Sequence, residues 1–178
     1  MDEPRQQSDR FDAFALVARQ GHLEGAVDPF DLDRVQDSLG DEDGEIPPAR
    51  VAYRLEGETD ALGRAVLNLT LDGEVPLQCQ RCMRLFSWPV HQRTQLLLAH
   101  DEQELSYLDD NDEREVLLAA GPLDPVQVVE DELVLTLPYV PRCDRPDCVA
   151  DAAGEIVEER PKPFDALGAL KGERNRKQ

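Results

Sequence analysis

Four cysteines, arranged as two pairs, are the residues of this sequence whose type and spacing could do chemistry. Cys79 and Cys82 are separated by two residues, and Cys143 and Cys148 by four. Two thiolates one tight turn apart can bind the same zinc ion, at an S–Zn distance of about 2.3 Å. The first pair has this spacing, and a loop containing Pro146 allows the second pair to join it. The pattern is therefore compatible with a four-cysteine zinc site.

Two other states of the thiols stay open. A redox-active pair usually has its thiol at a helix N-terminus in a βα unit, whereas the sequence around Cys79 favours strands. Reduced thiols without a metal are the other alternative. The gap between Cys82 and Cys143 is longer than the roughly 15–20 residues typical of compact zinc ribbons. Zinc is the candidate cofactor, with a thiol-redox pair and metal-free thiols as alternatives.

Polar side chains at the first cysteine pair could contact a partner. Gln80, Arg81 and Arg84 lie in or beside this turn. A guanidinium group can bind a phosphate or a carboxylate through two parallel hydrogen bonds; an ordinary surface position is the alternative. A second basic segment, residues 171–178, could contact RNA or fold back onto acidic residues.

Catalytic motifs are missing from the sequence. The three histidines, His22, His91 and His100, are scattered and none is near a serine or cysteine in a recognisable arrangement. A glycine-rich phosphate loop of the G-x4-G-K-[ST] type does not occur. We therefore expect a protein that is not an enzyme and has no small-molecule substrate.

The charge of the chain is strongly negative. Its 178 residues include 19 Lys and Arg against 38 Asp and Glu, so the net charge is −19. Broad RNA-binding surfaces are basic, because they release counterions from phosphates. The acidity therefore favours a basic protein partner, and leaves only a local RNA contact open. A polar start at residues 1–10 and the lack of a long apolar stretch predict a cytoplasmic protein with no membrane association.

Alternating apolar residues predict the centre of the fold. The alternation runs through residues 51–55, then 65–79, and resumes with the opposite parity over 86–98. This period of two is typical of half-buried strands. Two long strands should thus meet at the cysteine turn. Asp72-Gly73 predicts a bulge or bend, and Pro89 predicts an edge position or a kink.

The flanking segments are less regular. Residues 14–18 suggest a strand and 21–25 a turn, after which Asp28-Pro29 is typical of a helix start. Asp124-Pro125 repeats that signal, and we expect its helix to end before Pro138, although residues 133–137 could extend as a strand. Between these helices, residues 101–115 contain eight acids and one arginine. We expect a solvated acidic loop there, followed by a short strand at 116–119.

These segments predict an α+β fold, in which an antiparallel β-sheet with a long central hairpin is backed by one or two helices. The expected organisation is a disordered tail at 1–10, a single domain at 11–150 and a C-terminal extension at 151–178 with a basic tail. The domain would carry the cysteine turn at 79–82 and the acidic loop at 101–115.

Several segments resemble one known family. The sequence LQCQRCM at residues 77–83, followed by an aromatic strand, is similar to the YceD-type family of bacteria and plastids, which is named for large-subunit ribosomal RNA accumulation. Residues 23–25, 131–141 and 160–171 match the family pattern in consistent order. The resemblance implies a non-enzymatic ribosome biogenesis factor needed for normal levels of large-subunit (23S) ribosomal RNA. Cys79, Gln80, Arg81 and Cys82 would fall on the signature turn of the family, and Cys143 and Cys148 on its second cysteine region.

Three hypotheses follow for the function. The first is an assembly factor that binds a basic ribosomal protein or the large-subunit pre-ribosome around it. The second is a direct RNA-binding module that uses Arg81, Arg84 and the basic tail. The third is a zinc-binding or thiol-redox protein. The acidity of the chain favours the first.

Overall fold

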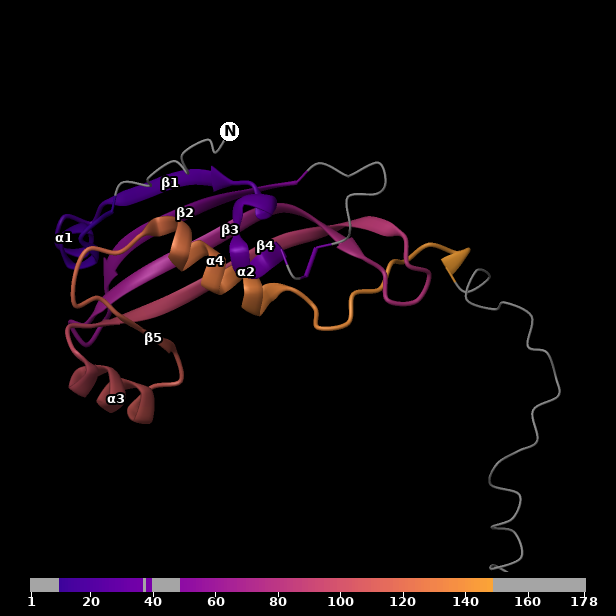
Figure 1. Ribbon diagram of the computed structural model, residues 1–178. Coiled ribbons are helices and arrows are strands. Elements are labelled where there is room, and N and C mark those ends of the chain that lie inside the picture. The colour runs from indigo at the N-terminus through magenta and orange to yellow at the C-terminus, as the bar shows by residue number, and fades with distance from the viewer. Residues whose placement is uncertain (1–9, 37, 40–48, 149–178) are drawn as a thin grey trace, which may run out of the picture. The chain divides into compact units, whose positions relative to one another are not determined.

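The computed structural model describes residues 10–36, 38–39 and 49–148, and the structural statements below refer to these residues. A five-stranded sheet in the order β1-β2-β3-β4-β5 organises the fold (Figure 1). The elements are α1 (Ala13–Ala18), β1 (His22–Val27), the 3-10 turn η1 (Pro29–Asp31), α2 (Asp33–Gln36), β2 (Arg50–Thr59), β3 (Ala65–Gln78), β4 (Leu85–Ala99), α3 (Glu102–Asn111), β5 (Glu115–Leu118) and α4 (Pro125–Thr136).

The α+β fold with a long central hairpin is confirmed. Strands β1 to β4 pair antiparallel in chain order, and β3 and β4 pair along 13 positions, from Val66 with Leu97 to Gln78 with Leu85. Strand β5 differs from the expectation, because it runs parallel to β4. A parallel neighbour needs a crossover connection, and α3 supplies it. The sheet is therefore mostly antiparallel, with one parallel strand in the described chain.

No bulge interrupts β3 at Asp72-Gly73, contrary to the sequence prediction. Gly73 pairs with Val51 on one side and with Val90 on the other, and the register is unchanged across it. A Cβ atom at position 73 would lie 2.1 Å from the carbonyl oxygen of Arg50. The glycine thus permits close approach of two strands rather than a bend. Pro89 lies at an edge as expected, since β5 pairs only with residues 96–99 of β4.

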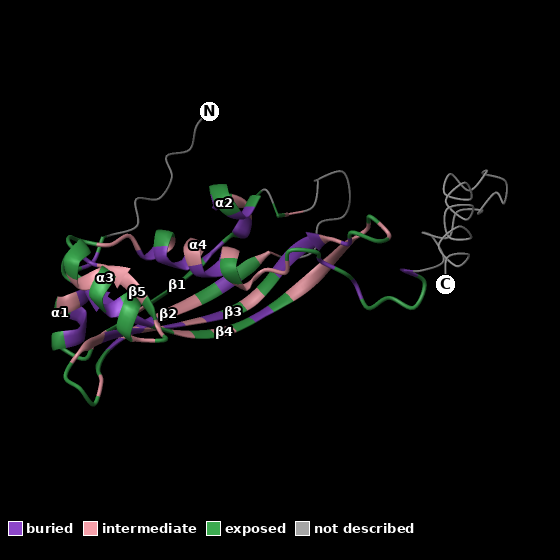
Figure 2. Ribbon diagram, turned by 90° about the horizontal axis from the view of Figure 1, so that it is seen from below, coloured by how far each residue is buried: buried purple, intermediate pink, exposed green. Residues whose placement is uncertain are grey.

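Helices α2 and α4 lie on the same side of the sheet (Figure 2). Most odd-numbered residues of β3 point to this side and are buried, which matches their alternation in the sequence. Burying one leucine side chain contributes about 1.5–3 kcal/mol. In α4, Asp124 accepts a hydrogen bond from the backbone N–H of Val126, and the helix ends before Pro138 as predicted. The buried residues of β3 on this side include Leu67, Leu69, Leu71, Val75 and Leu77.

The N-terminal elements correct two predictions. Residues 14–18 belong to helix α1 rather than to a strand, and residues 22–27 form strand β1 rather than a turn. The carboxylate of Asp12 caps α1 by accepting from the backbone N–H of Ala15 at 2.9 Å. The apolar run was too short to show a helical period, so the cap was its stronger signal. The helical start at Asp28 is confirmed, in the form of η1 followed by α2.

The predicted acidic loop is wrong for most of its length, because residues 102–111 form helix α3. Asp101 caps this helix by accepting from the backbone N–H of Glu104 at 2.8 Å, and acids in a first turn are favourable to the helix dipole. Leu108 is buried where α3 contacts β4 and β5. The acids remain at the surface, but on a helix. The short strand after it is confirmed as β5.

A closed ring of ion pairs joins the β2–β3 turn to the connection before β5. Arg64 binds Asp60 at 2.8 Å and Asp112 at 3.0 Å, and Arg114 binds the same two carboxylates at 3.1 and 2.9 Å. The pKa of Asp60 is lowered, chiefly by the hydrogen bond from the backbone N–H of Arg64. The pKa of Asp112 is lowered chiefly by the hydrogen bond from the Arg114 side chain. The ring thus holds both carboxylates ionised.

We expect Asp112→Asn to lower stability at neutral pH and to flatten its dependence on acid. A carboxylate whose pKa is lower in the folded than in the unfolded state stabilises the fold above its unfolded pKa. This stabilisation is lost as pH falls through the folded value. Urea unfolding between pH 7 and pH 2 measures the effect. Asp109→Asn, on the surface of α3, is the control and should leave stability unchanged or slightly raised. Equal behaviour of the two variants would contradict a stabilising ring.

The chain divides into two compact units, residues 1–144 and 145–178. Only residues 145–148 of the second are described. The predicted extension at 151–178, with its basic tail, lies outside the described residues, as do positions 1–9 of the predicted N-terminal tail. Within the described part of the chain, none of the helices has the length and apolar character to cross a membrane.

Candidate metal centre

The first cysteine pair lies in the tight turn that joins β3 to β4. The backbone N–H of Cys79 donates to the carbonyl of Arg84 at 3.0 Å, and that of Met83 donates to the carbonyl of Cys79 at 2.8 Å. Met83 has a φ of 59°, in the left-handed region that tight turns use. This turn sets Cys79 and Cys82 on one short loop. Cys79 is fully buried and Cys82 is half-buried.

The segment after α4 brings the second pair to this turn. The carbonyl of Pro141 accepts a hydrogen bond from the backbone N–H of Gln80 at 2.9 Å. Two residues on, the backbone N–H of Cys143 donates to the sulfur of Cys79 at 3.4 Å. The Arg81 guanidinium donates to the carbonyl of Cys143 at 3.4 Å. Three hydrogen bonds thus fix residues 141–143 against the hairpin turn.

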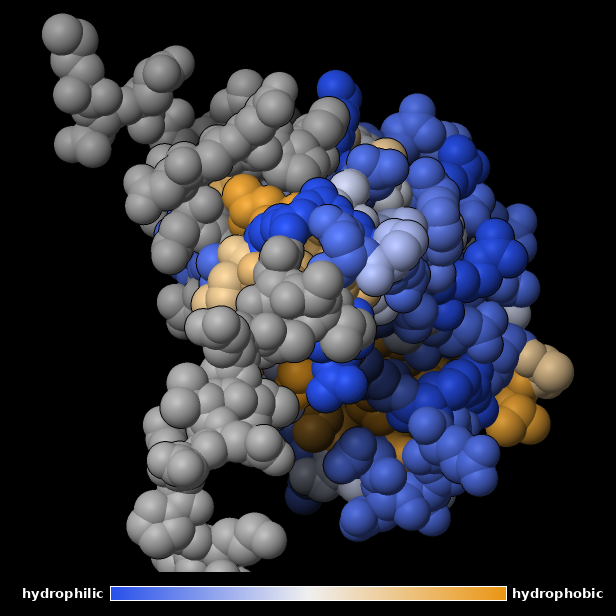
Figure 3. Space-filling model, turned by 90° about the vertical axis from the view of Figure 1, so that its right-hand side faces the viewer, coloured by the Kyte–Doolittle hydropathy of each residue, from blue (hydrophilic) through white to orange (hydrophobic). Residues whose placement is uncertain are grey.

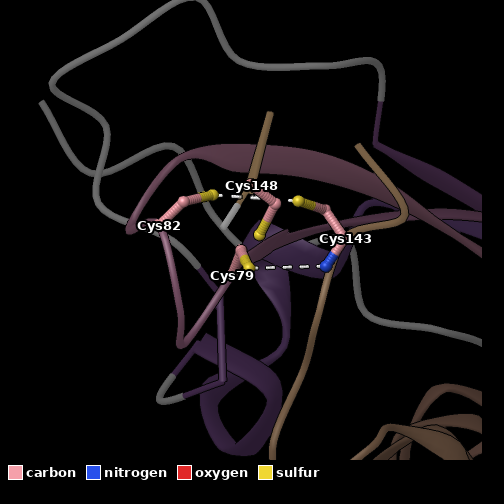
Figure 4. Close-up of side chains that lie close together, drawn as sticks. All are labelled: Cys79, Cys82, Cys143 and Cys148. Carbon is pink, nitrogen blue, oxygen red and sulfur yellow. Dashed lines mark hydrogen bonds between the residues drawn. The ribbon is translucent and has the colours of Figure 1, made fainter. Parts of the chain in front are cut away.

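The four sulfur atoms lie within 4.8 Å of one another, and Figure 4 shows the side chains that carry them. The sulfurs of Cys82 and Cys143 are 3.7 Å apart. Four sulfurs bound tetrahedrally to zinc at about 2.3 Å would be separated by about 3.8 Å, whereas a disulfide bond would bring two of them to about 2.05 Å. None of these four cysteines, all within the described part of the chain, forms a disulfide bond. Their number, chemistry and separation therefore fit a structural zinc ion.

The surroundings of the thiols suit a negatively charged group. Zinc with four thiolates carries a formal charge of −2. The N–H donor to the sulfur of Cys79 disperses part of such a charge. Arg81 and Arg84, which lie in the turn itself, would offset more of it. A site with four protein ligands has no open position, which is characteristic of structural rather than catalytic zinc.

The predicted site residues divide into two groups. The cysteines come together, and the structure adds backbone partners that the sequence did not indicate, namely the carbonyl of Pro141 and the N–H of Cys143. Of the predicted contact residues, Gln80 and Arg81 are exposed and Arg84 is half-buried. Two of the histidines contact side chains that do not belong to the cysteine centre. His91 interacts with Asp72 at 2.8 Å, and the ring of His100 stacks on that of Phe14 at 3.7 Å.

The chain matches a known protein family over part of its length. Residues 67–171, more than half of the chain, match the family described as large ribosomal RNA subunit accumulation protein YceD. The matched region begins in β3 and includes all four cysteines. No solved structure matches the chain significantly.

Proposed function

Because the chain belongs to the YceD family of large ribosomal RNA subunit accumulation proteins, we propose that it is a non-enzymatic ribosome biogenesis factor that supports accumulation of large-subunit (23S) ribosomal RNA. It does so by binding a basic ribosomal protein, or the pre-ribosomal surface around one. Such a factor acts in the bacterial cytoplasm. The observation that carries the choice of partner is the net charge of −19.

Helix α3 supports this choice because it concentrates exposed acids on a rigid element. Glu102, Asp109 and Asp110 are exposed on the helix, and Glu113 is exposed just after it. Clustered charges of one sign attract a partner of the other sign and accelerate its association. A basic ribosomal protein that has not yet bound RNA presents such a complementary surface. The acidic surface, defined as these four residues, is therefore the proposed docking site for the protein partner.

The cysteine centre has a structural part in this proposal. Cys79, Cys82, Cys143 and Cys148 would hold a zinc ion that joins the hairpin turn to the segment after α4. The ion would link two stretches of chain that are distant in the sequence, and it would not take part in a reaction. Gln80, Arg81 and Arg84 would then be held in a defined arrangement at the end of the hairpin, where they can contact a partner.

Capture from a lysate tests the proposed partner. Tagged full-length protein in low salt should recover a small basic ribosomal protein, and should lose it as the salt concentration rises. The Debye length falls from about 10 Å at 0.1 M to about 3 Å at 1 M, so charge attraction weakens over this range. Nuclease treatment before capture should leave the ribosomal protein bound. Recovery of RNA alone, with no protein that survives nuclease, would contradict the proposal.

A further inference from the structure

A tyrosine beside the cysteine centre is fully exposed. The side chain of Tyr139 is 100% accessible, compared with 66% for Tyr107 on α3. It lies in the segment between α4 and Cys143, where no other residue of the described chain covers its ring. An aromatic side chain normally buries a large apolar area. A ring that buries none has both faces available for a ligand.

Chain geometry places Tyr139 close to the hairpin turn. It precedes Pro141 by two residues, and the carbonyl of Pro141 accepts the hydrogen bond from Gln80. Because consecutive Cα atoms are about 3.8 Å apart, the Cα atoms of Tyr139 and Pro141 are separated by less than about 8 Å. Arg142 follows Pro141 directly and is exposed. Arg81, which follows Gln80 in the hairpin turn, is also exposed. The open ring therefore has guanidinium groups on the adjoining segments.

The acidic surface is too far away to oppose an anion at this end of the sheet. The whole of β4, 15 residues from Leu85 to Ala99, separates the cysteine turn from the start of α3. At a rise of about 3.3 Å per residue this strand is roughly 45 Å long. The Debye length at physiological salt is about 8 Å, so exposed charges at one end are screened from the other. Between Tyr139 and Cys148, Asp144 and Asp147 are matched in number by Arg142 and Arg145, so the net charge of −19 does not by itself exclude phosphate binding beside Tyr139.

The combination of an open aromatic ring and nearby arginine matches the chemistry of single-stranded RNA. An unpaired base can stack on an aromatic face while arginine binds the backbone phosphate. A duplex keeps its bases stacked and offers none to the ring. A protein partner would instead favour a continuous apolar centre. Figure 3 views the molecule from the right-hand side of Figure 1, and in the part of this face that grey atoms do not cover, hydrophobic areas alternate with hydrophilic ones. The exposed apolar side chains of the described segment and turn include Val140, next to Tyr139, and Met83.

We infer that Tyr139 and Arg142 form a contact for single-stranded RNA, in which a base stacks on Tyr139 and Arg142 binds a neighbouring phosphate. The contact goes beyond the proposed function, since it adds a second ligand at a surface separate from the acidic surface. It would allow the protein to hold an unpaired ribosomal RNA segment and a basic ribosomal protein at the same time. The two activities are separable by mutation.

Binding of a fluorescent 15-nucleotide RNA without self-complementarity tests this inference. Full-length protein should raise the anisotropy of the single strand more than that of the same sequence as a duplex. Tyr139→Ala should weaken single-strand binding about fivefold or more, which corresponds to the loss of one stacked base. Tyr139→Phe should retain binding because it keeps the ring. Arg142→Gln should lower the slope of log K against log salt by about 0.7, the value for one phosphate contact with a single strand.

Tyr107→Ala is the matched control, because it removes an exposed tyrosine from the acidic end. It should leave RNA binding unchanged, and thermal unfolding should show that each variant is folded. Equal binding by Tyr139→Ala and the unmodified protein would overturn the inference, as would equal weakening by Tyr107→Ala. Loss of a captured protein in Tyr139→Ala, with RNA binding intact, would overturn it in favour of a protein-binding surface. None of these results would affect salt-sensitive capture by the acidic surface.

Discussion

Replacement of Cys79 by serine is expected to abolish stoichiometric zinc binding and to lower the thermal unfolding midpoint by about 10 °C. Cys79 is fully buried, and its sulfur accepts the hydrogen bond from the N–H of Cys143. Removing one of four ligands leaves three thiols that bind zinc weakly. A stability loss on the order of 3 kcal/mol corresponds to this shift for a chain of this size. Metal analysis and differential scanning calorimetry provide the two readouts.

A chelator gives the control for this variant. All four cysteines belong to the cluster, so no cysteine elsewhere can serve as a neutral substitution. Chelation of the unmodified protein should lower its midpoint to that of Cys79→Ser, and should leave the variant unchanged. If the chelator left the unmodified protein unchanged, or lowered both midpoints equally, the cysteines would not owe their effect on stability to a metal.

Neutralising the acidic surface is expected to reduce capture of the basic ribosomal protein at low salt by about tenfold. The variant combines four substitutions, and its charge is less negative by four. Electrostatic steering changes association rates by a factor of about 10 to 10³ and weakens steeply as ionic strength rises. The difference in capture between the variant and the unmodified protein should therefore disappear at high salt. Asp101 and Asp112 are left in place because they cap α3 and join the ion-pair ring. The substitutions are Glu102→Gln, Asp109→Asn, Asp110→Asn and Glu113→Gln.

A second variant with the same change in charge tests whether location matters. It neutralises four exposed acids away from α3, and capture should fall much less than in the first variant. Quantitative mass spectrometry of the captured ribosomal proteins measures both. Equal losses would show that total charge, and not α3, attracts the partner. The control substitutions are Asp31→Asn, Glu58→Gln, Asp72→Asn and Glu74→Gln.

The central hairpin could be predicted from the sequence because its alternation is long and regular. Over 13 paired positions, one face of β3 and β4 is apolar, and this outweighs local exceptions such as Gly73. Helix α3 was missed because its composition suggested a solvated loop. A cap at Asp101 and a single buried leucine, Leu108, are sufficient for a helix that packs on only one side. An acidic composition indicates that a segment is exposed to solvent, but it does not distinguish an exposed helix from an irregular loop.

One acid in α4 shows the limit of helical periodicity. The helical spacing of the apolar residues Val126, Val129, Leu133 and Leu137 leaves Glu132 largely on the opposite face, yet this residue is only 6% exposed. It accepts a hydrogen bond from the hydroxyl of Thr94 on β4 at 2.6 Å. Burial raises the pKa of nearby Glu115, and the charge of Glu132 adds to this shift. The hydrogen-bond partner of Glu132 lies on β4, so the sequence of α4 alone could not reveal it.

The closure of the cysteine centre also depends on tertiary structure. The pairs could be recognised by their spacing, but the sixty residues between them argued against a common site. Strand β4 takes the chain away from the cysteine turn. After α3 and β5, the 12 residues of α4 cover about 18 Å of the return. The linker after Leu137 then reaches the turn at Gln80. The exposure of Tyr139 has the same origin, because it depends on where this linker runs.

Native mass spectrometry of the full-length protein, purified without chelator or added metal, tests the cysteine centre most directly. We expect a single species with one zinc ion per chain, which loses its metal on acidification and then shows four free thiols. A metal-free chain with a disulfide bond between two of the four cysteines would contradict a structural zinc site and support a thiol-redox protein instead.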